Sequence, residues 1–548
     1  MRAEAKAPAA DRPVAGGRLT PASRLLAVLV SLGVALAGCA WLAGIGHSAW
    51  LWPGQSDSAA VILAGDSMRH GNWLLKGWFL PYDTYWLLDI PLYAVAVAIL
   101  GVRPAVMHAV PLLLYLAVVA TGIWMAVKGS GGPTRLAAAA ITFVLLGLLG
   151  PTAAVTLLHG PAHVSTALAC LLAFVCLTWP TARRVSLTGT GLAFLLLTMA
   201  LVSDPMARII GLAPLVAAAA MGALRDRAWR PYVAPAVVPV AALVVAHFVK
   251  LGATALGGFL VVGGQPGLTP PAGWVGKLPL FWNSTLAIFG VQSAGGSLLA
   301  TAAGVVHLSG LILVVAATVF ALVRAVRRPQ PDQRGTTGGL LDSTLALGVA
   351  AGVAAFFASG YASDPTSIRY LSPAFIFGAI LAGRMVAAGA PRIEWRSSPL
   401  KQAVVALAGV LTAAYAITFA IVAVQPSPVN PAVGLASWLE SQGLTRGYGA
   451  YWASSIVTLF AEDRVQVRPV DEGTRGMEPY RWNSSRDWYA VNTAQPAIFL
   501  VFEPSAPWKG VDISSATASF GPPVATYVVG RYQVLRWDDD LTPLLQRR

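Results

Sequence analysis

The chain has 548 residues, of which 56% are apolar and 11% are charged, and its mean hydropathy is +0.65. This composition provides too little polar surface for a soluble protein of this length. The net charge of +14 does not indicate a nucleic-acid partner, because the basic residues lie in small groups between apolar runs. The sequence therefore predicts a polytopic α-helical membrane protein.

Apolar runs of spanning length predict about eleven transmembrane helices. A cytoplasmic N-terminal tail (residues 1–23) places most arginines and lysines of the connections on the cytoplasmic side, as the positive-inside rule requires. The Leu-Ala-Gly-Cys run at 36–39 resembles a lipoprotein cleavage box, but the apolar run continues beyond it, so we expect an uncleaved first span. The predicted spans in the plasma membrane are 24–46, 105–127, 134–150, 163–180, 186–202, 205–224, 232–251, 298–323, 340–359, 370–389 and 402–424.

The first outer connection, residues 47–104, is the richest in acidic and aromatic side chains. Apolar residues at helical spacing predict a helix from Asp57 to His70 that lies in the membrane interface. Asp66 has Arg69 and His70 at three and four residues, which predicts a surface ion pair. Asp57 has no such partner, so it is either the N-cap of this helix or a carboxylate of a functional site.

Two later outer connections contain the same Ser-Asp-Pro tripeptide, with Asp204 and Asp364 at its centre. This tripeptide is typical of a helix end, where Ser and Asp cap and Pro starts the next helix. We expect Asp364 to be such a cap. Asp204 lies in a much tighter connection, close to the bilayer boundary, where acidic residues are costly and often functional.

Two histidines, His159 and His163, precede the fourth predicted span at a spacing of four residues. Gly160 and Pro161 lie between them and no third ligand is evident, so the pattern does not favour zinc. For His163 we expect a hydrogen-bonding or phosphate-facing role.

Further candidates occupy the outer ends of late spans. Arg369 and Tyr370 enter a span from the outside, where the arginine either contacts lipid phosphate or binds a phosphate inside a site. The connection 252–297 is long and glycine-rich, and its short amphipathic segment contains Lys277. Such a loop is typical of a lid or binding loop, and a disordered connector is the alternative.

Residues 425–430 form a stiff proline-rich linker, after which the composition changes. Residues 431–548 predict a small extracytoplasmic α/β domain with a helix at 431–443 and strands at 497–502, 525–530 and 531–537, the last two as a hairpin. Its aromatic residues either stack on sugar rings or pack in the core. They include Trp452, Trp482, Trp488 and Tyr489.

The first outer connection resembles the first periplasmic loop of GT-C glycosyltransferases of the protein O-mannosyltransferase and aminoarabinose transferase type, which are family 39-like. Asp57 matches the first acid of that loop, Met68 the methionine late in its helix, and Gly71 and Trp73 its turn. Pro91 and Leu92 match its last segment. The sequence departs from the pattern at Ser58, which replaces a second acid, and at Asp89, where lysine is usual.

The resemblance implies a GT-C fold and transfer of a sugar from a polyprenyl-phosphate carrier to a glycan, lipid or protein acceptor of the cell envelope, with inversion. It implies that Asp57 is the catalytic base and that Asp204 shares this role or orients the acceptor. The residues expected to bind substrate are Arg369, Lys277, His163, Tyr370 and Asp89. No cofactor follows from the sequence, and a divalent metal remains an open alternative.

A non-enzymatic transporter or flippase for lipid-linked glycans, or a scaffold for them, is the competing interpretation. A transporter predicts internal repeats and acids near the middle of the membrane, whereas the notable acids here lie at the outer boundary.

Overall fold

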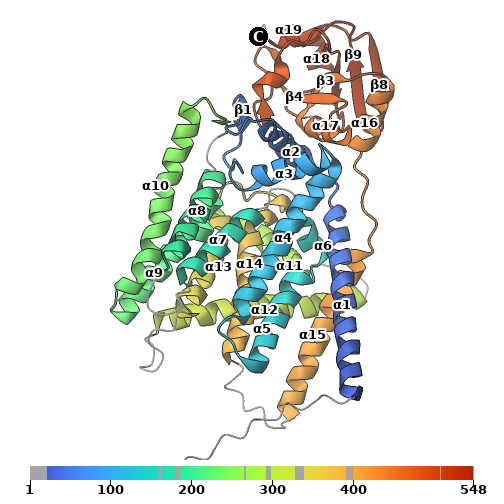
Figure 1. Ribbon diagram of the computed structural model, residues 1–548. Coiled ribbons are helices and arrows are strands. Elements are labelled where there is room, and N and C mark those ends of the chain that lie inside the picture. Colours follow the sequence, from blue (N-terminus) through green and yellow to red (C-terminus); the bar gives the residue numbers. More distant parts are fainter. Residues whose placement is uncertain are drawn as a thin grey trace, which may run out of the picture.

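The computed structural model describes residues 21–159, 163–178, 186–263, 267–291, 298–327, 338–389, 399–506 and 508–546. They form a helical bundle with an α/β region at one end (Figure 1). Seven described helices are long and apolar enough to cross a membrane, and an eighth candidate is a bent pair. The multi-pass helical architecture is confirmed, and the count of eleven spans stays a prediction.

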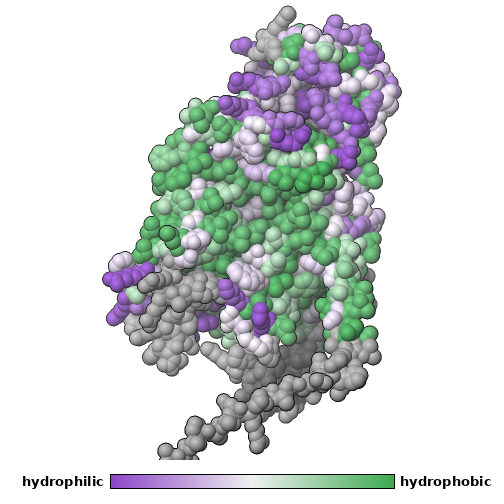
Figure 2. All heavy atoms as spheres, viewed as in Figure 1, coloured by the Kyte–Doolittle hydropathy of each residue, from purple (hydrophilic) through white to green (hydrophobic). Residues whose placement is uncertain are grey.

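The helices of the bundle present apolar side chains outward, and these form a broad apolar surface below the hydrophilic C-terminal region (Figure 2). Lipid tails are as apolar as leucine, so such a surface is stable in a bilayer. The bundle helices are α1 (Pro21–Ser48), α4 (Pro104–Val127), α5 (Gly132–Gly147), α6 (Pro151–Leu157), α7 (Val164–Thr178), α8 (Leu187–Ser203), α9 (Ala213–Asp226), α10 (Val233–Ala255), α11 (Trp274–Ile288), α12 (Leu298–Val326), α13 (Gly338–Ala358), α14 (Ser372–Gly389) and α15 (Pro399–Ala423).

The predicted third span, 134–150, ends in a sharp bend of 82° between α5 and α6. Gly150 is the N-cap of α6 and Pro151 is its first residue, an arrangement that starts a new helix. The bend frees carbonyl groups, and two of them gain side-chain donors. Trp41 donates to the Gly147 carbonyl at 2.8 Å, and Tyr115 donates to the Leu146 carbonyl at 2.8 Å.

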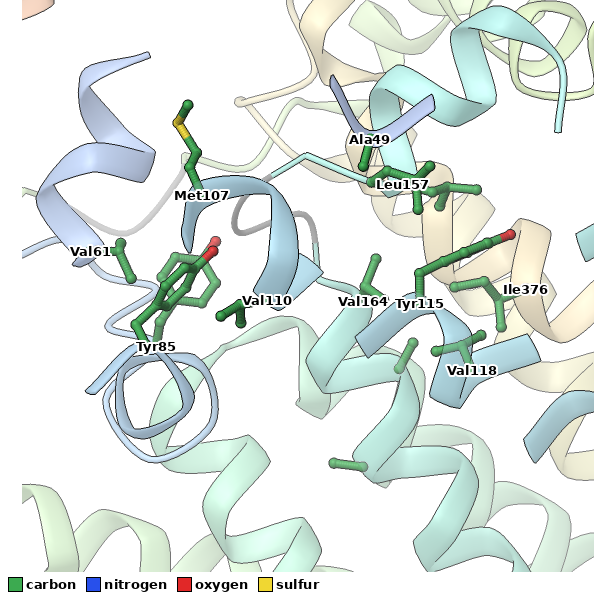
Figure 3. Close-up of a cluster of buried hydrophobic side chains, with 14 of the residues drawn as sticks. Ala49, Val61, Tyr85, Met107, Val110, Tyr115, Val118, Leu157, Val164 and Ile376 are labelled. Carbon is green, nitrogen blue, oxygen red and sulfur yellow. The ribbon is translucent and has the colours of Figure 1, made fainter. Parts of the chain in front are cut away.

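The first long connection folds into α2 (Ser56–Arg69), β1 (Trp78–Leu80) and α3 (Asp89–Leu100). The predicted helix from Asp57 to His70 is confirmed by α2. A Cβ atom at Gly65 would lie 2.9 Å from the Ala94 nitrogen, so glycine permits α2 and α3 to pack closely. Val61 of α2 and Tyr85 join Met107, Val110 and other residues in a buried cluster that fixes this connection to the bundle (Figure 3).

The C-terminal region contains a six-stranded sheet in the order β5-β4-β3-β7-β9-β8. β3 pairs in parallel with β4 and β7, and the other pairs are antiparallel. The predicted strands near 497–502, 525–530 and 531–537, their hairpin and the helix near 431–443 are confirmed. The elements are α16 (Ala432–Ser441), β3 (Arg446–Ala450), η8 (Tyr451–Ala453), α17 (Ser455–Phe460), β4 (Gln466–Gly473), β5 (Gly476–Pro479), β7 (Phe499–Phe502), α18 (Ile513–Phe520), β8 (Ala525–Val529), β9 (Tyr532–Arg536) and α19 (Thr542–Gln546).

A second, three-stranded sheet joins segments that are far apart in the sequence. β1 pairs in parallel with β2 (Leu260–Val261) and antiparallel with β6 (Ser484–Ser485). The register places Phe79 opposite both Leu260 and Ser484. The C-terminal region is therefore hydrogen-bonded to the first connection, which in turn is hydrogen-bonded to the 252–297 connection.

Candidate active site

A cleft with two lobes lies where the C-terminal region meets the bundle. The larger lobe has a volume of about 520 Å³ and the smaller about 190 Å³. Both are lined by the same five residues, Gln55, Asp57, His159, Arg369 and Trp482, so they belong to one cleft. We call the larger the aromatic lobe, which adds Trp52, Val155, Thr156, Thr366, Ile368, Tyr451, Trp452, Tyr480 and Trp508. The smaller, the inner lobe, adds Ser58, Val61, Pro81, Asp83, Tyr85, Tyr361, Tyr370 and Asn483.

Asp57 lies in the first turn of α2, and its side chain does not cap that helix. The N-cap is Gln55, which makes no side-chain capping bond, so the N-cap alternative for Asp57 is wrong. Instead, the Tyr451 hydroxyl donates to Asp57 Oδ1, and Asn483 Nδ2 donates to the same oxygen at 3.3 Å. Within the described part of the chain, Asp57 Oδ2 accepts no hydrogen bond. The carboxylate is thus held through one oxygen, and the other is left for a ligand in the cleft.

Burial raises the pKa of the Asp57 carboxyl above its usual value. The hydrogen bond from Tyr451, the charge of Arg369 and the hydrogen bond from Asn483 oppose this effect in that order. A carboxylate with a raised pKa binds a proton more strongly than an ordinary aspartate does, which suits the role of a general base.

Arg369 lies in η6 (Pro365–Leu371) and lines both lobes. Its guanidinium donates to the Tyr370 hydroxyl at 3.2 Å and lies 5.1 Å from the centre of the same ring. Asp364 caps η6 and accepts from the Thr366 nitrogen at 2.8 Å, which confirms the predicted cap. Among the described residues, no carboxylate lies within 4.0 Å of Arg369, so its charge is available for an anion in the cleft.

Asp204 and His163 lie behind the cleft, and neither lines a lobe. Asp204 is 1% exposed, and its Oδ2 lies 2.7 Å from His163 Nδ1 and accepts from the Thr166 hydroxyl at 2.6 Å. Its Oδ1 accepts from the Met206 nitrogen at 2.8 Å. The His163 ring lies 5.5 Å from the Tyr370 ring. This buried network occupies the Asp204 carboxylate with contacts inside the chain, and its expected share in catalysis stays a prediction.

Asp89 and Lys277 also lie outside both lobes. Asp89 is 4% exposed at the start of α3, where it accepts from the Ser165 hydroxyl at 2.7 Å. Lys277 donates to the Thr269 hydroxyl at 2.8 Å and to the Ser359 carbonyl at 2.5 Å. Contacts between segments of the chain occupy both side chains, and their expected binding of substrate stays a prediction. Across the described ranges, no group of three or more His, Cys, Asp and Glu residues is arranged to hold a metal ion.

Sequence reasoning missed several residues of the cleft. Tyr451 and Asn483 come from the C-terminal region, and Asp83 lines the inner lobe, where it accepts from the Tyr85 hydroxyl at 2.8 Å. No local pattern marks these residues, although the density of aromatic side chains after residue 450 signals an aromatic surface. Of the four aromatic residues expected to stack or pack, Trp452 and Trp482 line the aromatic lobe, whereas Trp488 packs on Trp78 and Tyr489 is buried.

No protein-family model matches the sequence, and no curated protein matches it either. The structure is similar to ArnT from Cupriavidus metallidurans in the apo state, with a TM-score of 0.55 and 15% identity over 95% of this chain and 99% of that one. It is also similar to the same protein bound to undecaprenyl phosphate, with a TM-score of 0.53 and 14% identity over 92% of this chain and 97% of that one. ArnT is a GT-C glycosyltransferase, so the expected GT-C fold is confirmed.

Proposed function

We propose that this protein is a glycosyltransferase that moves a sugar from a polyprenyl-phosphate carrier to a cell-envelope acceptor on the outer face of the membrane. One observation carries the proposal: Asp57 and Arg369 line the same two lobes. Among the residues that the structure describes, Asp57 Oδ2 accepts no hydrogen bond and Arg369 has no acidic partner within 4.0 Å. The similarity to ArnT, which was solved with undecaprenyl phosphate, supports a carrier of that chemical class.

In the proposed reaction, an acceptor hydroxyl attacks the anomeric carbon of the donor sugar. The bond between this carbon and the phosphate oxygen breaks, and its electron pair leaves with the lipid phosphate. Asp57 Oδ2 takes the hydroxyl proton, while Tyr451 and Asn483 hold Oδ1. Arg369 stabilises the negative charge that develops on the departing phosphate. Attack from the face opposite the phosphate inverts the configuration.

The lipid tail of the donor needs an apolar path beside Arg369. α11 packs against η6, the element that carries Arg369. The side chains of Val275, Leu278 and Trp282 on α11 are 71%, 50% and 53% exposed. In a bilayer this surface contacts lipid, so a prenyl chain lying along α11 stays out of water while its phosphate enters the cleft.

The test is to incubate the purified protein with a panel of polyprenyl-phosphate sugars and an envelope extract as acceptor, and to measure released polyprenyl phosphate. We expect release that depends on both donor and acceptor. If no donor releases phosphate, with or without divalent cations, the proposal is wrong and a transporter or scaffold becomes the better interpretation.

The transfer rate should depend on pH through Asp57. The base acts only when ionised, and burial raises its pKa, so kcat/KM is expected to fall as the pH drops and to fall earlier than for an ordinary aspartate. The phosphodiester of the donor stays ionised over this range and does not contribute. A pH profile of kcat/KM measures the apparent pKa, and a rate that stays constant down to about pH 4 would contradict the assignment.

The Tyr451→Phe variant should shift this profile. It removes a hydrogen bond to the ionised carboxylate, which contributes about 1.5–3 kcal/mol, so the apparent pKa of the acid limb should rise by about one to two units. Transfer near neutral pH should therefore fall and recover as the pH rises. Damage to the fold lowers the rate at every pH, so recovery at high pH separates the two effects. An unshifted profile would show that Tyr451 does not act on Asp57.

A further inference from the structure

We infer that the aromatic lobe binds a neutral carbohydrate, the sugar unit that carries the attacking hydroxyl of a glycan or glycolipid acceptor. The inference rests on the proposed glycosyl transfer and adds the class of the acceptor. It follows from the kinds of side chain that line this lobe, whose aromatic members come mostly from the C-terminal region.

Six aromatic side chains line the lobe, and all but Trp52 belong to the C-terminal region: Tyr451, Trp452, Tyr480, Trp482 and Trp508. The ring planes of Trp452 and Trp508 meet at 76°, and those of Tyr480 and Trp508 at 83°. Because these two pairs meet edge to face rather than stacking, neither ring of a pair covers the whole face of the other. Lys509 Nζ lies 4.4 Å from the centre of the Tyr480 ring, so the ring faces offered to a ligand are those of the other aromatic residues. The negative face of an aromatic ring attracts the C–H groups that cover one side of a pyranose.

A second observation points to a ligand with hydroxyl groups. Trp508 Nε1 is buried and has no hydrogen-bond partner within the described ranges. A buried donor without an acceptor costs about 1–3 kcal/mol, so a ligand group that accepts from this indole N–H removes that cost. A sugar hydroxyl in the lobe satisfies this donor once a small shift of the Trp508 ring brings the buried N–H within its reach.

The remaining polar groups of the lobe are mostly neutral. Gln55, Thr156 and Thr366 supply amide and hydroxyl groups that both donate and accept hydrogen bonds, as sugar hydroxyls require. Among the described residues that line the lobe, the acidic and basic side chains other than His159 are Asp57 and Arg369, which the proposed reaction uses. The lobe therefore lacks the several cations that an anionic acceptor needs, and it has too few aliphatic side chains to bind an acyl chain.

The size and position of the lobe agree with this ligand. Its volume of about 520 Å³ lies within the roughly 300–1,000 Å³ typical of small-molecule sites. Asp57 lies in the same wall as the aromatic residues, so a sugar bound there has a hydroxyl within reach of the base. The C-terminal region lies on the hydrophilic end of the molecule, the side from which a glycan arrives (Figure 2).

The experiment measures binding without turnover, in the Asp57→Asn protein. Soluble neutral oligosaccharides of gluco, manno and galacto configuration are titrated, and saturation-transfer NMR reports binding. We expect at least one series to bind, and Trp508→Ala to weaken its binding by about tenfold, the effect of losing a hydrogen bond and a ring face together. Trp508→Phe, which keeps an aromatic ring but loses the N–H, should give a smaller loss. Because this variant still fills the space with a ring, its binding shows whether the loss in Trp508→Ala comes from misfolding.

The matched control is Trp229→Ala, which removes a tryptophan that is 67% exposed and outside the cleft. Its binding should equal that of the parent protein. If no neutral oligosaccharide binds, or if Trp508→Ala binds as well as its parent, the inference is overturned. Release of polyprenyl phosphate by the wild-type protein is measured separately, so failure of the acceptor class is distinguished from failure of the proposed transfer.

Discussion

The Asp57→Asn variant is expected to lose sugar transfer by about 10²–10⁴-fold in kcat, the usual contribution of a general base. Asparagine has the shape of aspartate and keeps an oxygen for the donors Tyr451 and Asn483, but it cannot take a proton.

The variant should also be at least as stable as the wild type. The pKa of Asp57 is raised in the folded protein, so stability is lost as the pH rises through that pKa, and the ionised carboxylate destabilises the fold at neutral pH.

Initial rates of polyprenyl-phosphate release and thermal unfolding curves measure the two effects. Asp66→Asn is the matched control, because Asp66 lies on the same helix but pairs with Arg69 at 2.8 Å and lines neither lobe. It should keep nearly full activity. Full activity of Asp57→Asn would disprove the catalytic assignment, and an equal loss in Asp66→Asn would point to general damage to α2.

Local patterns allowed the prediction of α2 and of the role of Asp66. The apolar spacing over one helix and the i,i+3 relation between Asp66 and Arg69 depend only on neighbouring residues, and both are present in the structure. The capping role of Asp364 is local in the same way. Such features need no knowledge of how distant segments pack.

The partners of Asp57 could not be predicted, because they depend on contacts between distant segments. Tyr451 lies 394 residues after Asp57, and Asn483 reaches it because β6 pairs with β1. Strands of two or three residues, such as β6, leave almost no periodic pattern in a sequence. The same reason applies to the contacts of Lys277. The sequence predicts its amphipathic segment, but its ammonium group donates to the Ser359 carbonyl, which follows another helix far along the chain.

Arg369→Gln is the second variant with a large expected effect, a loss of about 10²–10³-fold in kcat. Glutamine still donates a hydrogen bond, but it carries no charge to balance the phosphate that departs. Arg369→Lys should recover part of the loss, because an ammonium keeps the charge but lacks the planar fork that donates two parallel hydrogen bonds. Rates at saturating donor and acceptor measure kcat, and the donor KM is determined in the same experiment.

Arg208→Gln is the control, since Arg208 is exposed, lines neither lobe and donates to the Tyr82 hydroxyl at 3.2 Å. The division of the Arg369→Gln loss between kcat and KM decides what the arginine does. A loss in kcat means that Arg369 interacts more strongly with the transition state than with the bound donor. A loss confined to the donor KM means that it holds the phosphate equally in both states, and stabilisation of the leaving group then needs another residue of the inner lobe.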